Sequence, residues 1–160
     1  MKDLPMEIEK IISILQNSKF FENMAPEDIA RVASLCREEF YDQGAFVFKQ
    51  GNCGEHLYTI VEGLIHLERI VNLGHRKGRT LIDTLGRGRT LGCWSALLGE
   101  SHILMSSASV QKPTTVLKLA GRDLRCMMTE NSAFGFNIME RLCFLLRERI
   151  QAAYGAMDRI

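Results

Sequence analysis

The sequence predicts an α+β fold in which helices at both ends flank an antiparallel β barrel or jelly roll. Two observations predict it. Apolar residues recur at helical spacing near both ends of the chain, and between residues 37 and 120 they recur at a spacing of two, in short runs separated by glycines. A length of 160 residues suits one domain. We therefore predict a single domain over 1–160, with helices in 1–36, the barrel in 37–120 and helices in 121–160.

The N-terminal part predicts two helices. Residues 6–16 carry apolar side chains at helical spacing with charged residues between them, which is typical of an amphipathic helix. A second helix is expected from Pro26 to about Cys36, because proline has the fixed φ of the first helical position. Glu27 and Asp28 place negative charge in its first turn, where the helix dipole favours it.

The barrel is predicted from short runs with alternating apolar residues that glycines interrupt. The first runs contain Phe40, Phe46, Phe48, Leu57, Ile60, Val61, Ile65, Leu67 and Ile70. Later strands fit 79–85, 105–112 and 114–119. Wrapping such strands around a common core protects the sheet edges, as barrels and jelly rolls do.

After Gly121 the spacing returns to the helical value of about 3.6. It predicts a short helix over 122–129 and a long one over 133–157. Residues 142–146, Leu-Cys-Phe-Leu-Leu, are apolar on more than one face of the long helix, which a helix lying on a single surface does not need. We expect a second surface to cover this helix.

Composition gives little bias toward a class of partner. A net charge of +1 favours neither nucleic acid nor an anionic membrane. The N-terminus has no apolar signal region, and no segment reaches the roughly 18 apolar residues that span a bilayer. We therefore expect a cytoplasmic protein with no membrane partner. We expect its cysteines to be reduced thiols, because the five cysteines form no C-x-x-C pair.

The segment Gly88–Val110, GRTLGCWSALLGESHILMSSASV, has a layout suited to holding an anion. A strand-like entry ends at Leu91, and Gly92 lets the backbone approach a ligand closely. Residues 95–98 favour a short helix, whose first N–H groups carry partial positive charge.

With the upstream motifs Gln43-Gly44, Gln50–Glu55, Leu57–Gly63 and Leu85–Gly88, the sequence resembles the cyclic nucleotide-binding domain superfamily, which includes the catabolite activator protein and kinase regulatory subunits. The resemblance implies a jelly-roll barrel of the double-stranded β-helix type. It also implies a regulatory or sensory function and a long C-terminal helix that pairs with its twin in a two-fold dimer.

The ligand chemistry of the family is missing from 88–110. In the family, a glutamate of the corresponding segment accepts a hydrogen bond from the ribose, and an arginine binds the cyclic phosphate. The glutamate position falls here on Cys93 or Trp94, and the arginine position falls on Ser106 or Met105. We therefore expect weak or no binding of cyclic AMP and cyclic GMP.

The candidate ligand-binding residues are Gly92, Cys93, Trp94, Ser95, Ala96, Ser106, Ser107 and Tyr154. Ala153 and Tyr154 fall where the long helix of the family meets the purine. We expect a neutral or singly anionic ligand, partly aromatic or hydrophobic. The alternative is a protein-interaction or dimerisation module in which Trp94 and Met105 fill the pocket.

The predicted homodimer stripe of the long helix consists of Met139, Leu142, Leu145, Leu146, Ile150 and Ala153. Activators of this family continue past this helix into a helix-turn-helix that reads DNA. The chain ends at Ile160, so we expect no direct DNA binding. A further alternative is the sensor part of a transcription regulator without its helix-turn-helix.

Rival sites are less well supported. The basic loop 72–79 fits a solvated hairpin tip, and His66 and Glu68 lack the additional histidines of a cupin metal site. A haem ligated by Cys93 is a further alternative. We expect no metal and no cofactor. We also expect no enzymatic activity, because no nucleophile, base and acid occur together at a suitable spacing.

Overall fold

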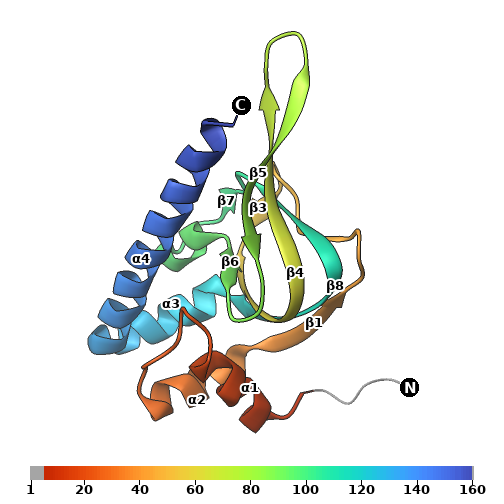
Figure 1. Ribbon diagram of the computed structural model, residues 1–160. Coiled ribbons are helices and arrows are strands. Elements are labelled where there is room, and N and C mark those ends of the chain that lie inside the picture. The colour runs from red at the N-terminus through yellow and green to blue at the C-terminus, as the bar shows by residue number, and fades with distance from the viewer. Residues whose placement is uncertain (1–5, 160) are drawn as a thin grey trace.

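The computed structural model describes residues 6–159. Its N-terminal helices, α1 (Ile8–Gln16) and α2 (Pro26–Leu35), lie at one end of the strands, and α3 (Gly121–Glu130) and α4 (Ser132–Met157) follow the last strand (Figure 1). These bounds agree within about two residues with the four predicted helices. Within the described chain, no helix combines the length and the apolar character needed to cross a membrane.

The strands form a curled antiparallel sheet with a small second sheet beside it. The strands are β1 (Arg37–Tyr41), β2 (Phe46–Phe48), β3 (Cys53–Gly54), β4 (His56–Asn72), β5 (Lys77–Leu85), β6 (Thr90–Gly92), β7 (His102–Ile103) and β8 (Ser107–Ala120), and a 3-10 helix, η1 (Trp94–Leu98), follows β6. The order is β1-β8-β4-β5, with β2 paired to β8 and β6 to β4, while β3 pairs with β7. The α+β jelly-roll prediction is confirmed, although the sheet does not close into a complete barrel.

The predicted strands 105–112 and 114–119 form one strand, β8, with Pro113 in its interior. Proline has no N–H to donate, so it fits only where the ladder is interrupted. The β4–β8 pairing shifts register between Glu62 and Leu64, opposite this proline. Gly63 lies there at φ +117°, and a Cβ on it would meet the Thr114 hydroxyl oxygen at 2.1 Å.

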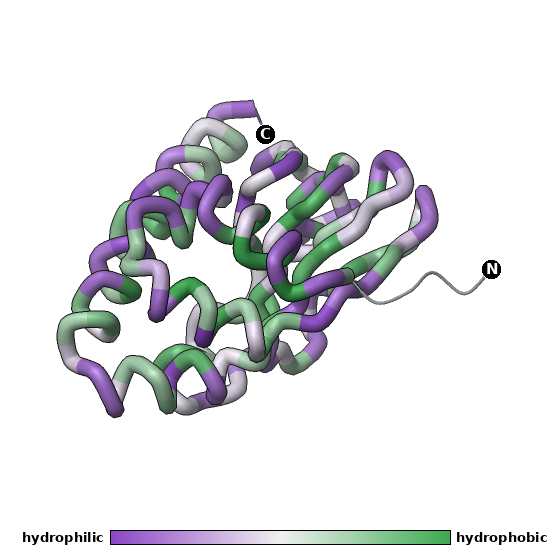
Figure 2. Tube along the Cα trace, turned by 90° about the horizontal axis from the view of Figure 1, so that it is seen from below, coloured by the Kyte–Doolittle hydropathy of each residue, from purple (hydrophilic) through white to green (hydrophobic). Residues whose placement is uncertain are grey.

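The core has two parts. One lies under the helices and includes Leu15, Ile29 and Phe134, and the other lies within the sheet and includes Ile60 and Leu85. Hydrophobic and hydrophilic residues alternate along the elements (Figure 2), as amphipathic elements require.

Helix α4 buries a face that the dimer prediction had assigned to a partner. Leu142 is only 5% exposed and lies in the core under the helices. Leu145 and Leu146 pack against the same core. The predicted stripe is therefore wrong at Leu142, because α4 uses that side to contact its own domain. The large apolar residues of α4 that are exposed are Phe136, Met139, Phe144, Ile150, Tyr154 and Met157.

Candidate functional site

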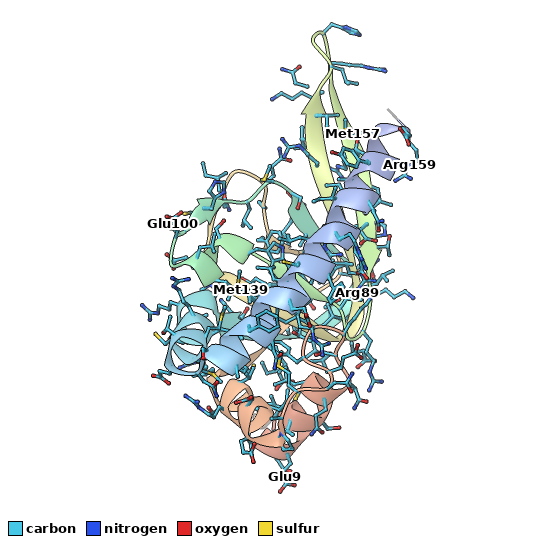
Figure 3. The ribbon with its side chains drawn as sticks, turned by 90° about the vertical axis from the view of Figure 1, so that its left-hand side faces the viewer. Glu9, Arg89, Glu100, Met139, Met157 and Arg159 are labelled. Carbon is cyan, nitrogen blue, oxygen red and sulfur yellow. The ribbon has the colours of Figure 1, made fainter. Side chains whose placement is uncertain are left out.

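A cavity of about 730 Å³ lies between α4 and the inner face of the sheet. Its walls come from β4, β5, the segment from Leu91 to Ser95, the segment from His102 to Ser106, and the C-terminal half of α4. Helix α4 runs across this side of the domain, with Met157 at its C-terminal end (Figure 3). The volume is within the range of about 300–1,000 Å³ typical of small-molecule sites.

Most side chains that line the cavity are apolar. On the sheet side they include Phe48, Leu67, Val71, Ile82 and Leu91. On α4 they are Leu146, Ile150, Ala153, Ala156 and Met157. Such a wall offers contact to an apolar or aromatic body and few partners to a polar one.

The turn from β6 into η1 forms one end of the cavity. Gly92 has φ +139°, and a Cβ there would lie 2.3 Å from the His56 carbonyl oxygen. The Cys93 N–H donates to that same carbonyl at 3.0 Å. The N–H groups of Trp94 and Ser95 have no acceptor among residues 6–159 and are free to bind a ligand.

Trp94 lies beside the cavity without filling it. Its ring packs against Phe20, with ring centroids 5.9 Å apart. The side chain is half-buried and also contacts the core under the helices. The indole is therefore a wall of the cavity and a natural fluorescent reporter of it.

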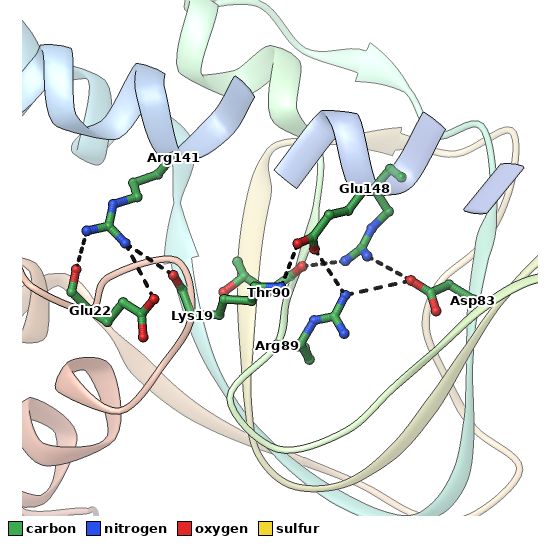
Figure 4. A network of polar contacts seen from close by, with 8 residues as sticks. Lys19, Glu22, Asp83, Arg89, Thr90, Arg141 and Glu148 are labelled. Atoms are coloured by element: carbon green, nitrogen blue, oxygen red, sulfur yellow. Dashed lines mark hydrogen bonds and ion pairs between the residues drawn. The ribbon is translucent and has the colours of Figure 1, made fainter. Parts of the chain in front are cut away.

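Two arginines contribute to the cavity wall, and their surroundings differ. Arg149 of α4 is 13% exposed and donates to Asp83 Oδ2 at 3.0 Å and to the Thr90 carbonyl at 2.8 Å (Figure 4). Burial lowers the pKa of the Arg149 guanidinium, although the charge of Asp83 acts in the opposite direction. Arg69 of β4 donates through Nη1 to the Met105 carbonyl.

An ion-pair network holds α4 against the domain next to the cavity (Figure 4). Glu148 accepts from Lys19 at 2.5 Å, and Arg89 lies 3.6 Å from Glu148 and 3.7 Å from Asp83. The hydrogen bond from Lys19 lowers the pKa of the Glu148 carboxyl. The network connects α4 to β5, to the residue before β6 and to the segment between α1 and α2.

Residues 38–131 match the family model of the cyclic nucleotide-binding domain. The chain belongs to this family. Its cavity lies where α4 faces part of the segment Gly88–Val110, which the sequence predicts to have a layout suited to holding an anion.

Relatives of known name support the same assignment. The chain is 31% identical over 134 residues to the cyclic AMP receptor protein of Thermus thermophilus, covering 84% of this chain and 60% of the receptor. It is 28% identical over 147 residues to the cGMP-dependent protein kinase egl-4 of Caenorhabditis briggsae, covering 87% of this chain but only 18% of the kinase. The chain thus spans about 60% of the bacterial relative and a small part of the kinase.

Solved structures share the fold. A cyclic nucleotide-binding domain from Methylobacillus flagellatus superposes with a TM-score of 0.76 at 22% identity, over 96% of this chain and 82% of that one. The catabolite activator protein of Thermus thermophilus gives a TM-score of 0.69 at 28% identity, over 88% of this chain and 62% of that one.

The structure brings five of the eight predicted ligand-binding residues to the cavity wall. These are Gly92, Cys93, Trp94, Ser95 and Ser106. Ala96 is instead buried against Gly121, and the Ser107 hydroxyl accepts from the Gln50 N–H at 2.9 Å. Tyr154 is 64% exposed and lies outside the lining. Ala153 faces the cavity, and because successive residues of a helix point in different directions, Tyr154 faces outward.

The residues that the sequence predicts at the family's ribose and phosphate positions, Cys93, Met105 and Ser106, all line the cavity. Cys93 is buried and its Sγ lies 3.8 Å from the His102 carbonyl, while Met105 is exposed and Ser106 lines the cavity. Arg69 and Arg149 are cavity residues that the sequence reasoning missed. Strand alternation in the sequence could have placed Arg69 on the inner face, because it shares its strand face with Leu67 and Val71.

The rival sites gain no support from the structure. Of the basic segment, residues 73–76 are the tip of the β4–β5 hairpin, where Asn72 pairs with Lys77, and His66 Nδ1 lies 3.9 Å from Glu68, a contact on one strand face. Within residues 6–159, no cluster of three metal-ligating side chains occurs. The five cysteines are free thiols.

Proposed function

We propose that this domain is a sensory module that binds a small molecule in the cavity under α4, and that cyclic AMP and cyclic GMP bind it weakly or not at all. The observation that supports the proposal is an open cavity of about 730 Å³ whose wall is mostly apolar. An open cavity favours a ligand sensor over a module whose pocket is filled by its own side chains.

The weak nucleotide binding is expected from the residues at the cassette positions. Cys93 cannot replace a glutamate that accepts from ribose, and Met105 and Ser106 carry no charge for a phosphate. Loss of one member of a buried charge pair costs about 2–5 kcal/mol, which lowers affinity by roughly 1.5 to 3.5 decades. The better ligand is neutral or singly anionic and partly aromatic or hydrophobic, because apolar contact contributes about 25 cal/mol per Å² buried.

The cyclic nucleotides in the relatives' names are the first compounds to test. Titration calorimetry with cyclic AMP and cyclic GMP is expected to give dissociation constants far above the micromolar range. In parallel, Trp94 emission is expected to respond to an aromatic apolar probe, because Trp94 is the only tryptophan and lies in the cavity wall. A sub-micromolar constant for either nucleotide would overturn the proposal.

We further propose that the domain forms a homodimer through α4. Phe136, Cys143, Ile150 and Met157 are exposed and seven residues apart, and seven-residue spacing is the pattern by which two helices pair. Met139 and Tyr154 extend the same exposed stripe. We propose this stripe in place of the one predicted from the sequence, and the two have Met139 and Ile150 in common.

Sedimentation velocity tests the dimer. The variant Phe136→Glu/Tyr154→Glu is expected to sediment as a monomer where the unmodified chain sediments as a dimer. Phe40→Glu is the matched control, because Phe40 is 62% exposed and lies on β1, away from α4. A monomer of the unmodified chain at high concentration would contradict this part of the proposal.

A further inference from the structure

Arg69 occupies an inward position on β4 where its neighbours are apolar. Side chains alternate between the two faces of a strand, so Leu67, Arg69 and Val71 share one face. All three line the cavity. A guanidinium at this position places a permanent positive charge in a mostly apolar wall.

No carboxylate within the described part of the chain lies within ion-pair distance of Arg69. The nearest acidic residue in sequence, Glu68, faces the other side of β4, where it lies 3.6 Å from Arg79. The second arginine of the cavity, Arg149, is neutralised by Asp83 at 3.0 Å. The uncompensated charge of the arginines in the cavity wall therefore belongs to Arg69.

The bond from Arg69 Nη1 to the Met105 carbonyl orients this charge. It holds the guanidinium beside the exit of the cassette, next to Ser106, which lines the same cavity. The Ser106 hydroxyl has no hydrogen-bond partner among residues 6–159. A guanidinium has five N–H donors, so several remain for a ligand.

We infer that Arg69 is the anion anchor of the cavity, and that the ligand carries one negative charge at one end of an apolar or aromatic body. A carboxylate or sulfonate would accept from Arg69 and Ser106, and the body would pack between Leu146 and Ala153 of α4 and Val71 and Ile82 of the sheet. This inference rests on the proposed function, because it assumes that the cavity binds a small molecule.

Two fluorescent probes separate the charge from the apolar body. Anilinonaphthalene sulfonate carries one negative charge, and N-phenyl-1-naphthylamine has the same ring system without it. Energy transfer from Trp94, the single tryptophan of the chain, reports the binding of each probe to the domain. Hydrogen bonds to a charged group contribute about 1.5–3 kcal/mol, so Arg69→Gln is expected to weaken the sulfonate roughly ten- to hundredfold.

The neutral probe is expected to bind Arg69→Gln and the unmodified chain within about twofold of each other. Arg69→Lys, which keeps the charge, is expected to recover part of the sulfonate affinity. Arg79→Gln is the matched control: it removes one positive charge from the neighbouring strand, and Arg79 lies outside the cavity lining. It is expected to change neither affinity.

Equal affinity of the sulfonate for Arg69→Gln and the unmodified chain would overturn the inference, and so would an equal loss for both probes. Binding of neither probe to the unmodified chain, with each probe raised to its solubility limit, would contradict the proposed function itself. The two failures are therefore distinguishable.

Discussion

Replacing Asp83 by asparagine is expected to destabilise the domain, because it removes the carboxylate that pairs directly with the Arg149 guanidinium. Arg149 is 13% exposed and Asp83 is 25% exposed, and their side chains are 3.0 Å apart. Asparagine keeps the size of aspartate and removes only its charge. Arg89, 3.7 Å from Asp83, loses the same partner but retains Glu148.

The expected loss lies between the limits for buried and exposed pairs. Removing one partner of a fully buried pair costs about 3–5 kcal/mol, and an exposed pair is worth about 0.2–1 kcal/mol. Because both side chains keep some contact with solvent, we expect Asp83→Asn to lower the free energy of unfolding by about 2–3 kcal/mol. For a chain of this length, 1 kcal/mol corresponds to about 2–4 °C in melting temperature, so the expected decrease is about 4–12 °C.

Urea unfolding and thermal melting followed by circular dichroism measure both quantities. Glu130→Gln is the matched control, because it breaks an ion pair with Arg31 in which the side chains are 63% and 49% exposed. It should cost less than about 1 kcal/mol. Equal losses for the two variants would refute the reasoning that burial of Arg149 sets the cost. The double variant Asp83→Asn/Arg149→Met should lose less than the sum of its single variants, because it leaves no unpaired charge at position 149.

Three further measurements test the backbone, the thiols and the pH dependence. Gly92→Ala is expected to destabilise the domain by at least about 1–3 kcal/mol, from its positive φ alone, whereas Gly155→Ala, with open space around it in α4, should be neutral or stabilising; equal melting temperatures would contradict the strain at Gly92. Burial raises the pKa of Cys36 to about 12, so at pH 8 it should react with iodoacetamide much more slowly in the folded domain than in urea, and an equal rate in both would contradict its burial. Because Lys19 lowers the pKa of Glu148, the stability that this carboxylate contributes is present above its unfolded pKa of about 4.3 and is lost as the pH falls through the folded pKa. The difference in free energy of unfolding between the unmodified chain and Glu148→Gln should therefore shrink with acidification. A difference that grows would contradict the lowered pKa of Glu148.

The sequence alone was sufficient for the four helices, the antiparallel strands and the family. Pro26 and the acidic residues after it mark the start of α2, and the change from a spacing of two to 3.6 after Gly121 marks the end of the strands. Gly92 and its neighbours were recognisable because a close backbone approach requires glycine. These features depend on residues near one another in the chain, so local patterns contain them.

The tertiary structure alone decided which residues face one another across the cavity. The helical period shows that α4 is apolar on several sides, but only its angle against the sheet determines that Leu142 is buried, that Ala153 faces the cavity and that Tyr154 faces outward. Strand alternation could place Arg69 on a face, whereas its approach to Met105, 36 positions away, follows from the β4–β8 pairing, which ends at Glu68 and Ser107. Such contacts join distant segments, and their geometry depends on packing that no local pattern records.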